Sequence, residues 1–316
     1  MTEAPKYHAW LFWLAVATAV LAFILIGSGG TVTSTGVGMV DEGWTFSPFN
    51  LFTVRGMEQV INNLGMFIEH SHRQLGYIVG MCALALAALC YYAERGPRRW
   101  LGSAVLLAVC IQGALGAARI LLNPKKGVID PNLGRDFAMV HGYFGQLTFA
   151  FLVGCTLAFS RSWVNRQTET SQQAEPFQRL SKLLFIMFLV QLLLAVLVRH
   201  YGGGLLIIAH ASVAGVILVM VLTATFQAMK LPGSLVKQPI YLLGIAVILM
   251  ILLGTSAWWF GGGYGALSDL DPNLHRVTLA TLHQWLGALT LATSLVISLR
   301  AKRHLIPLAI SPEVVR

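Results

Sequence analysis

Charged side chains are scarce in this sequence: Asp, Glu, Lys and Arg together make up 11% of its 316 residues. A water-soluble domain typically carries about 25% charged residues, so this scarcity excludes a soluble fold. Intrinsic disorder is excluded as well, because 56% apolar residues give the chain too much apolar surface to remain solvated. A mean hydropathy of +0.69 instead indicates a protein that resides in a membrane.

Cysteine is also rare, and metal-binding motifs are missing. Cys82, Cys90, Cys110 and Cys155 all lie in apolar stretches, where a thiol packs as a small hydrophobic side chain. We therefore expect neither a structural disulfide nor a CxxC metal site. The sequence contains no HExxH motif and no cysteine cluster, which disfavours a tetrahedral zinc site.

Eight apolar stretches are long enough to cross the hydrocarbon core as helices, which requires about 20 residues each. Because only residues 202–204 separate the fifth stretch from the sixth, we expect a tight helical hairpin there. The sequence thus predicts an all-α integral membrane protein with eight transmembrane helices. The expected spans are residues 10–30, 74–93, 100–122, 138–160, 180–199, 205–229, 239–260 and 280–300.

The excess of positive charge predicts how the chain is oriented. No basic cluster carries interleaved aromatic residues, so the net charge of +9 indicates loop charges, and we expect no nucleic-acid partner. With a cytoplasmic N-terminus, 14 Lys and Arg residues fall on the cytoplasmic side and 8 outside. The positive-inside rule therefore favours cytoplasmic N- and C-termini. The short segment before the first span has no room for an Arg-rich presequence, which favours a bacterial plasma (inner) membrane.

The two halves of the chain resemble each other around four histidines. The segment HGYFGQLTFA, which starts at His141, matches HQWLGALTLA from His283 at five of ten positions. The segment HRQLGYIVG from His72 matches HASVAGVIL from His210 more weakly. Since each half contains four spans, the repeat is parallel and predicts two pseudo-symmetric four-helix bundles. The expected units are an N-terminal bundle over residues 1–165, a cytoplasmic linker over 166–175 and a C-terminal bundle over 176–316.

Each of these histidines stands near the start of an even-numbered span, so we expect all four at similar depth near the outer face. His72 and His141 can then face each other in one bundle, as two axial ligands of a haem iron do. His210 and His283 can do the same in the other bundle. The residue four positions later lies on the same helix face, where a bulky side chain would strike a flat porphyrin. These positions all hold small residues: Gly76, Gly145, Ala214 and Gly287.

A packing role with a hydrogen bond is the alternative for any single membrane histidine, although ionisable groups in spans are typically functional. His70, His200 and His275 stand outside the repeat. Of these, His275 is the most credible alternative ligand, but we expect it in an outer loop.

Ionisable residues beside His72 indicate chemistry in the first bundle. Glu69 shares a helical face with His72 if the second span starts that early, and it can then transfer a proton at whatever His72 binds. The alternative is a carboxylate favoured by the dipole at a helix N-terminus. Arg73, Arg135 and Arg276 lie near outer helix ends, where they either pair with haem propionates or extend to the membrane interface.

The sixth span lacks these ionisable residues. The segment LLIIA precedes His210, and position 211 is Ala rather than Arg. The first bundle is therefore equipped for chemistry, and the second for holding a cofactor.

The whole chain resembles the haem A synthase family. The resemblance rests on eight spans, a four-helix repeat, one histidine at the start of each even-numbered span, and the ExxHR motif of Glu69, His72 and Arg73. It implies oxidation of the C8 methyl of haem O to a formyl group, which gives haem A for terminal oxidases. The partners implied are haem O, membrane lipid, haem O synthase and an electron acceptor.

The same resemblance implies a role for each predicted residue. His72 and His141 would hold the substrate haem O, and Glu69 would act in the chemistry there. His210 and His283 would ligate a haem b cofactor. Many members carry a cysteine pair in the first outer loop, but residues 31–71 here contain none, so a thiol role for that loop is not expected.

Two alternative functions and one question about the first outer loop stay open at this point. A di-haem electron carrier would modify nothing, but carriers across a membrane usually stack haems at two depths. A permease is suggested by the parallel repeat, but its broken helices with midplane polar groups are not evident. The aromatic-rich outer loop between residues 31 and 72 either packs on the membrane surface or forms a lid over the substrate.

Overall fold

The computed structural model describes residues 6–38, 40, 62–122, 132–233, 235–260 and 274–308, and these are almost entirely helical. Eight of the helices are long and apolar enough to cross a membrane, which confirms the expectation of a multi-pass helical membrane protein. They are α1 (Ala9–Ser34), α3 (Leu64–Ala93), α4 (Leu101–Leu121), α5 (Leu133–Phe159), α7 (Ala174–Tyr201), α8 (Gly204–Met229), α9 (Lys237–Phe260) and α10 (Leu274–His304). The shorter elements are η2 (Gly96–Trp100), α6 (Arg161–Val164), β1 (Glu169–Ser171) and β2 (Leu305–Pro307).

Several helices begin earlier than their apolar stretches suggest. Helix α3 starts at Leu64 instead of residue 74, and the Asn63 side chain caps it by accepting a hydrogen bond from the Met66 N–H at 3.1 Å. Helix α10 starts at Leu274, which places His275 in its first turn and corrects the expectation that His275 lies in a loop. The physical reason is that a helix continues through the polar interfacial region, beyond the hydrocarbon core that apolar stretches report.

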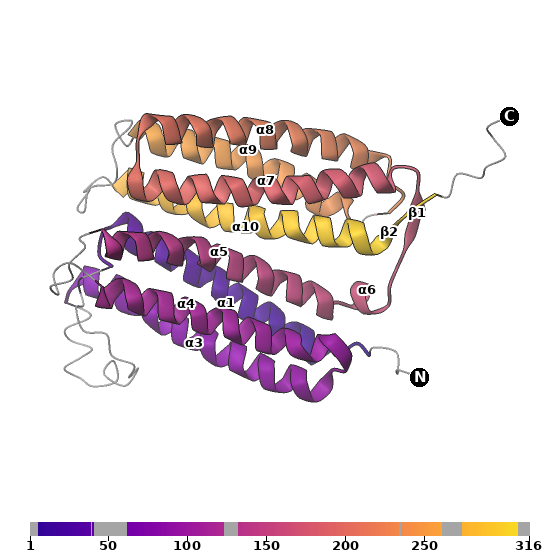
Figure 1. Cartoon of the computed structure of the whole chain (residues 1–316), viewed down its shortest axis with the longest axis horizontal. Coiled ribbons are helices and arrows are strands. Elements are labelled where there is room, and N and C mark those ends of the chain that lie inside the picture. Colours follow the sequence, from indigo (N-terminus) through magenta and orange to yellow (C-terminus); the bar gives the residue numbers. More distant parts are fainter. Residues whose placement is uncertain are drawn as a thin grey trace.

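The eight long helices form two groups of four (Figure 1). In the first group, which we call the N-terminal set, α1, α3, α4 and α5 contact one another in a ring, so that α3 and α5 occupy opposite corners. In the C-terminal set, α7, α8, α9 and α10 form a similar ring, with α8 and α10 at opposite corners. The histidine-bearing helices therefore lie diagonally across each set.

Helices α1, α5 and α10 join the two sets through close packing. A Cβ added to Gly27 of α1 would lie 2.7 Å from the Trp285 ring of α10, so only glycine permits this approach. The Trp285 indole N–H donates a hydrogen bond to the Phe23 carbonyl at 2.7 Å. The Phe23 ring stacks on both Trp285 and Phe149 of α5, with ring centres 4.9 Å and 5.5 Å apart.

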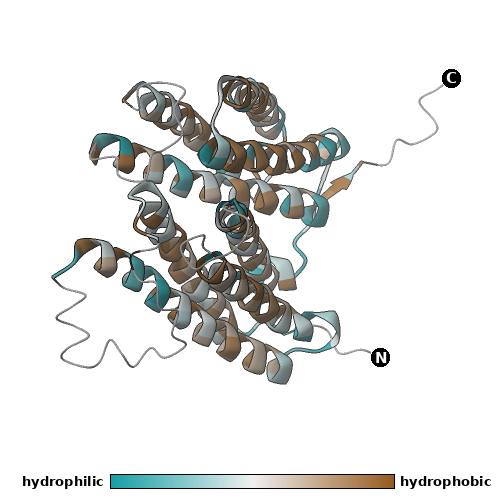
Figure 2. Cartoon of the chain, turned by 60° about the vertical axis from the view of Figure 1, so that its left-hand side comes forward, coloured by the Kyte–Doolittle hydropathy of each residue, from teal (hydrophilic) through white to brown (hydrophobic). Residues whose placement is uncertain are grey.

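Apolar residues make up most of each long helix (Figure 2), and many of their side chains are exposed. An apolar surface of this extent marks a membrane interaction site, because a water-soluble protein rarely exposes one. Among the exposed side chains are Leu205, Val219, Phe226, Leu242 and Trp259.

The two short connections at the ends of α7 have different structures. Between α7 and α8 the chain turns within Gly202 and Gly203, both at positive φ, which confirms the expected tight hairpin. The expected linker 166–175 is not wholly irregular: β1 pairs in parallel with β2, and the last two linker residues belong to α7. The start of α1 and strand β2 lie at the same end of the molecule (Figure 1).

Candidate functional site

A cavity of about 1580 Å³ extends through both helix sets. A pocket for one small ligand typically measures about 300–1,000 Å³, so this cavity has room for more than one large group. Most of the site residues predicted from the sequence line it: Glu69, His72, Arg73, Gly76, His141, Gly145, His210, Ala214, Arg276, His283 and Gly287.

The four histidines lie at comparable depth. The helices that carry them, α3, α5, α8 and α10, all begin at the same end of the molecule (Figure 1). Each histidine follows the first residue of its helix by six to nine positions, or about 9–14 Å along the axis. Each histidine therefore lies further from its helix start than the sequence suggests, because the helices begin earlier than their apolar stretches.

His283 and His141 lie on the last long helix of their sets, and the helix before each of them supports the imidazole. In the C-terminal set, His283 Nδ1 donates a hydrogen bond to the Met250 carbonyl at 3.0 Å. One turn further along α9, a Cβ on Gly254 would lie 2.8 Å from the His283 ring. In the N-terminal set, the Gln112 carbonyl of α4 faces His141. A Cβ on Gly116, again one turn further, would lie 3.3 Å from that ring.

The other two imidazoles have equivalent surroundings. The Leu25 carbonyl of α1 faces His72, and the ring lies against Gly29, where a Cβ would be 2.9 Å away. Ser28 Oγ adds a hydrogen bond to His72 Nδ1 at 2.8 Å. The Gln191 carbonyl of α7 faces His210.

The same support thus occurs four times: a carbonyl from the preceding helix faces each ring. A histidine that binds a metal typically directs its second ring nitrogen to such a carbonyl, which fixes the ring orientation. The Nδ1 atoms of His72 and His283 take part in hydrogen bonds, so Nε2 of each ring is left to bind a ligand in the cavity. His210 Nε2 instead contacts the Gln191 side-chain Nε2 at 3.3 Å.

The imidazoles are arranged as two pairs, one in each helix set. The His210 and His283 ring centres are 6.2 Å apart, with the rings tilted by 66°. Two metal–imidazole bonds of about 2.0–2.1 Å on opposite sides of one ion, plus the radius of each ring, give a separation of about 6 Å. His72 and His141 also lie within electrostatic range of each other. Among the described residues, no cluster of three or more His, Cys, Asp or Glu side chains could hold a metal ion.

Space for a flat group is present beside the histidines. A Cβ on Gly76 would meet no atom within 4 Å. On Gly145 its nearest neighbour would be Gln112 Oε1 at 3.7 Å, and on Gly287 it would be Met250 Cε at 3.3 Å. Gly76 therefore lines open cavity and Gly145 has room for an ordinary contact, whereas Gly287 packs closely against Met250.

The Glu69 carboxylate is held in place by arginine side chains and by a backbone N–H. The side chain is 4% exposed, and its carboxylate accepts hydrogen bonds from Arg73 at 2.7 Å and from the Val40 N–H at 3.0 Å. Arg119 of α4 interacts with it electrostatically. Folding brings α4 and the segment after α1 against this carboxylate, and these elements supply Arg119 and the Val40 N–H.

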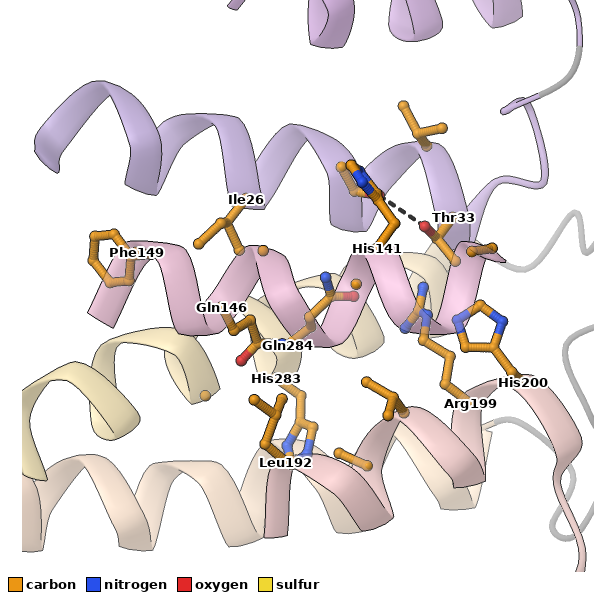
Figure 3. A pocket seen from close by; sticks show the side chains of 18 of the residues that line it. Ile26, Thr33, His141, Gln146, Phe149, Leu192, Arg199, His200, His283 and Gln284 are labelled. Atoms are coloured by element: carbon orange, nitrogen blue, oxygen red, sulfur yellow. Dashed lines mark hydrogen bonds between the residues drawn. The ribbon is translucent and has the colours of Figure 1, made fainter. Parts of the chain in front are cut away.

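Four arginines line the cavity: Arg73, Arg119, Arg199 and Arg276. Arg119 and Arg199 are not among the residues predicted from the sequence, although a cation inside an apolar span is a signal for function. Arg199 donates hydrogen bonds to Ser34 Oγ of α1 at 2.7 Å and to the Gly30 carbonyl at 3.4 Å, so it connects the two sets. Figure 3 shows Arg199 beside His200 at one end of the pocket, with Phe149 at the other.

The remaining candidates lie elsewhere. Arg135 is outside the cavity lining, where it pairs with Asp136 at 3.6 Å and stacks over Tyr201. His275 is also outside the lining and packs near Phe260, so the structure does not support it as an alternative ligand. The proposed lid falls largely on residues 41–61, which are outside the described residues.

Comparison with models of known protein families gives no match to this chain, and comparison with curated proteins gives none either. The interpretation of the site therefore rests on its geometry and on the sequence motifs.

Proposed function

We propose that this chain is a haem A synthase: a membrane oxidoreductase that converts the C8 methyl of haem O into a formyl group. In this proposal its two helix sets are pseudo-symmetric four-helix bundles, spanning residues 1–165 and 176–316. His72 and His141 bind the substrate haem O, and His210 and His283 bind a haem b cofactor. The observation that carries the proposal is the pairing of four imidazoles, each facing a helix carbonyl, around one large cavity.

The residues present fit haem better than a bare metal ion. Two imidazoles about 6 Å apart would hold a haem iron between them, and Gly76 and Gly145 would leave room for the macrocycle. A bound haem would supply the redox chemistry, and the protein supplies binding, orientation and electrostatics. Arg73, Arg119, Arg199 and Arg276 offer positive charge for propionate groups.

The two sets differ in their ionisable residues, which supports placing the substrate in the N-terminal set. Glu69 and Arg73 flank His72, whereas Ile207 and Ala211 occupy the matching positions around His210. In the proposed mechanism Glu69 accepts or delivers a proton at the substrate. Arg73 and the Val40 N–H hold its carboxylate in place for that transfer.

The proposed setting is a bacterial plasma membrane with both termini in the cytoplasm, so that the histidines lie toward the outer face. Haem O synthase would supply the substrate, and a redox partner would exchange electrons with the chain. A di-haem electron carrier is the alternative function, since the two histidine pairs resemble each other. The comparable depth of the four histidines disfavours it, because one depth does not carry electrons across a bilayer.

Pigment extraction separates the two functions. We expect cells that express this chain together with a haem O source to accumulate formylated haem, detected by chromatography and mass spectrometry. A folded, haem-loaded chain that yields only unmodified haem would favour the carrier and contradict the synthase.

A further inference from the structure

We infer that Gln112 recognises an oxygen-bearing substituent at the edge of the haem held by His72 and His141. This inference rests on the proposed function. Gln112 lies in α4 and lines the cavity, and its Nε2 atom is buried without a hydrogen-bond partner among the described residues. A buried donor without a partner is costly, so a ligand that brings an acceptor oxygen to this atom binds more favourably than one that does not.

The C-terminal set contains a position that matches Gln112, so the two side chains can be compared. Met250 of α9 offers its carbonyl to His283, as Gln112 offers its carbonyl to His141. Each side chain also lies over the glycine four residues after that histidine. Met250 Cε would be 3.3 Å from a Cβ on Gly287, and Gln112 Oε1 would be 3.7 Å from a Cβ on Gly145. The fold thus places an amide in one set where it places a thioether in the other.

The two side chains present different chemistry to their ligands. A methionine thioether packs against hydrocarbon and donates no hydrogen bond, whereas a glutamine amide offers two N–H donors. The amide occurs in the set that also holds Glu69 and Arg73. The haem of the N-terminal set is therefore the one that carries oxygen at its edge, as a hydroxymethyl or formyl group does. The cofactor haem presents only hydrocarbon at the equivalent place.

Binding of haem O and haem A to the purified full chain tests this inference. We expect the N-terminal site to bind haem A about three- to tenfold more tightly than haem O, the effect of one net hydrogen bond. Gln112→Met, which copies the C-terminal set, should abolish this preference. Met250→Leu is the matched control and should retain it. In resonance Raman spectra, the formyl stretching frequency of bound haem A should rise in Gln112→Met, because the hydrogen bond is lost.

The spectrum of haem at His210 and His283 reports whether each variant is folded. If Gln112→Met loses that spectrum, Gln112→Leu serves as a second variant. It removes the same donor with a side chain of different shape, and it should also abolish the preference for haem A. A folded variant that keeps the preference and the formyl frequency would overturn the inference and leave the proposed function standing. If neither haem binds in a way that depends on His72 and His141, the proposed function itself fails.

Discussion

Two buried glutamates in this chain are paired in the same way with an arginine one helical turn later. Glu69 and Arg73 are 2.7 Å apart near the start of α3, and Glu94 and Arg98 are 2.9 Å apart beyond its other end. The two carboxylate side chains are equally buried, at 4% exposure each. Only Glu69 lines the cavity, so the pair near Glu94 shows what such an ion pair does for structure alone.

The two ion pairs therefore predict different effects when each glutamate is replaced by glutamine. Glu69→Gln should lower formation of formylated haem by about 100-fold or more, the usual contribution of a positioned acid or base, while the haem at His210 and His283 is retained. Glu94→Gln should cost stability but leave turnover per folded molecule close to that of the wild type. Product analysis together with absorbance spectra measures both effects. Normal product formation in Glu69→Gln would remove this residue from the mechanism.

The sequence predicts the residues whose spacing repeats, and it misses those that folding alone brings to the site. The four histidines are identified because they recur at fixed places in similar segments, and Glu69 because it stands three residues before His72. Arg119 and Gln112 have no such pattern, since their positions on α4 matter only once α4 packs beside α3 and α5.

At the scale of elements, the connection between α7 and α8 depends on backbone conformation. Gly202 has φ 66° and ψ −158°, a region that is essentially restricted to glycine. The turn brings His210 back to the level of the other three histidines, because it connects α7 to α8 without a longer loop.

We therefore predict that Gly202→Ala lowers the free energy of unfolding by about 1–3 kcal/mol, the cost of a side chain in this backbone region. Gly80→Ala is the control: it lies in the middle of α3, where an added Cβ meets no atom within 4 Å. Thermal unfolding in detergent, followed by circular dichroism, compares the two variants. Equal midpoints for both would contradict the role of this turn.

The membrane-spanning parts of the helices are predictable from the sequence, but several helix ends are not. Apolar composition reports the part of a helix that crosses the hydrocarbon core, and this part is found in all eight cases. The first two turns of α3 and α10 carry ionisable residues such as Glu69 and Arg276, which lower the local hydropathy without breaking the helix. The pairing of β1 with β2 joins three residues on each side that are far apart in the sequence, and no local pattern announces it.

For the whole molecule, the arrangement of the helices fixes which connections share a side of the membrane. The start of α1, the 166–175 segment and β2 lie at one end, and the turn between α7 and α8 lies at the other (Figure 1). The excess of Lys and Arg predicts that the first of these ends faces the cytoplasm.

Thiol labelling of intact cells tests this orientation. We predict that a membrane-impermeant reagent labels Tyr201→Cys, at the end of α7, and does not label Arg166→Cys until the cells are opened. Both positions are at least partly exposed, so access to the thiol depends on the side of the membrane. The reverse labelling pattern would show that the chain is inserted in the opposite orientation.

The iron coordination of the purified, haem-supplied chain shows directly whether pairs of imidazoles bind haem iron. Electron paramagnetic resonance and haem content should be measured for the wild type and for His72→Ala, His141→Ala, His210→Ala and His283→Ala. The account predicts two low-spin haems in the wild type. It also predicts that either alanine variant of a pair removes only that pair's signal. Four variants that all keep both wild-type signals would contradict it.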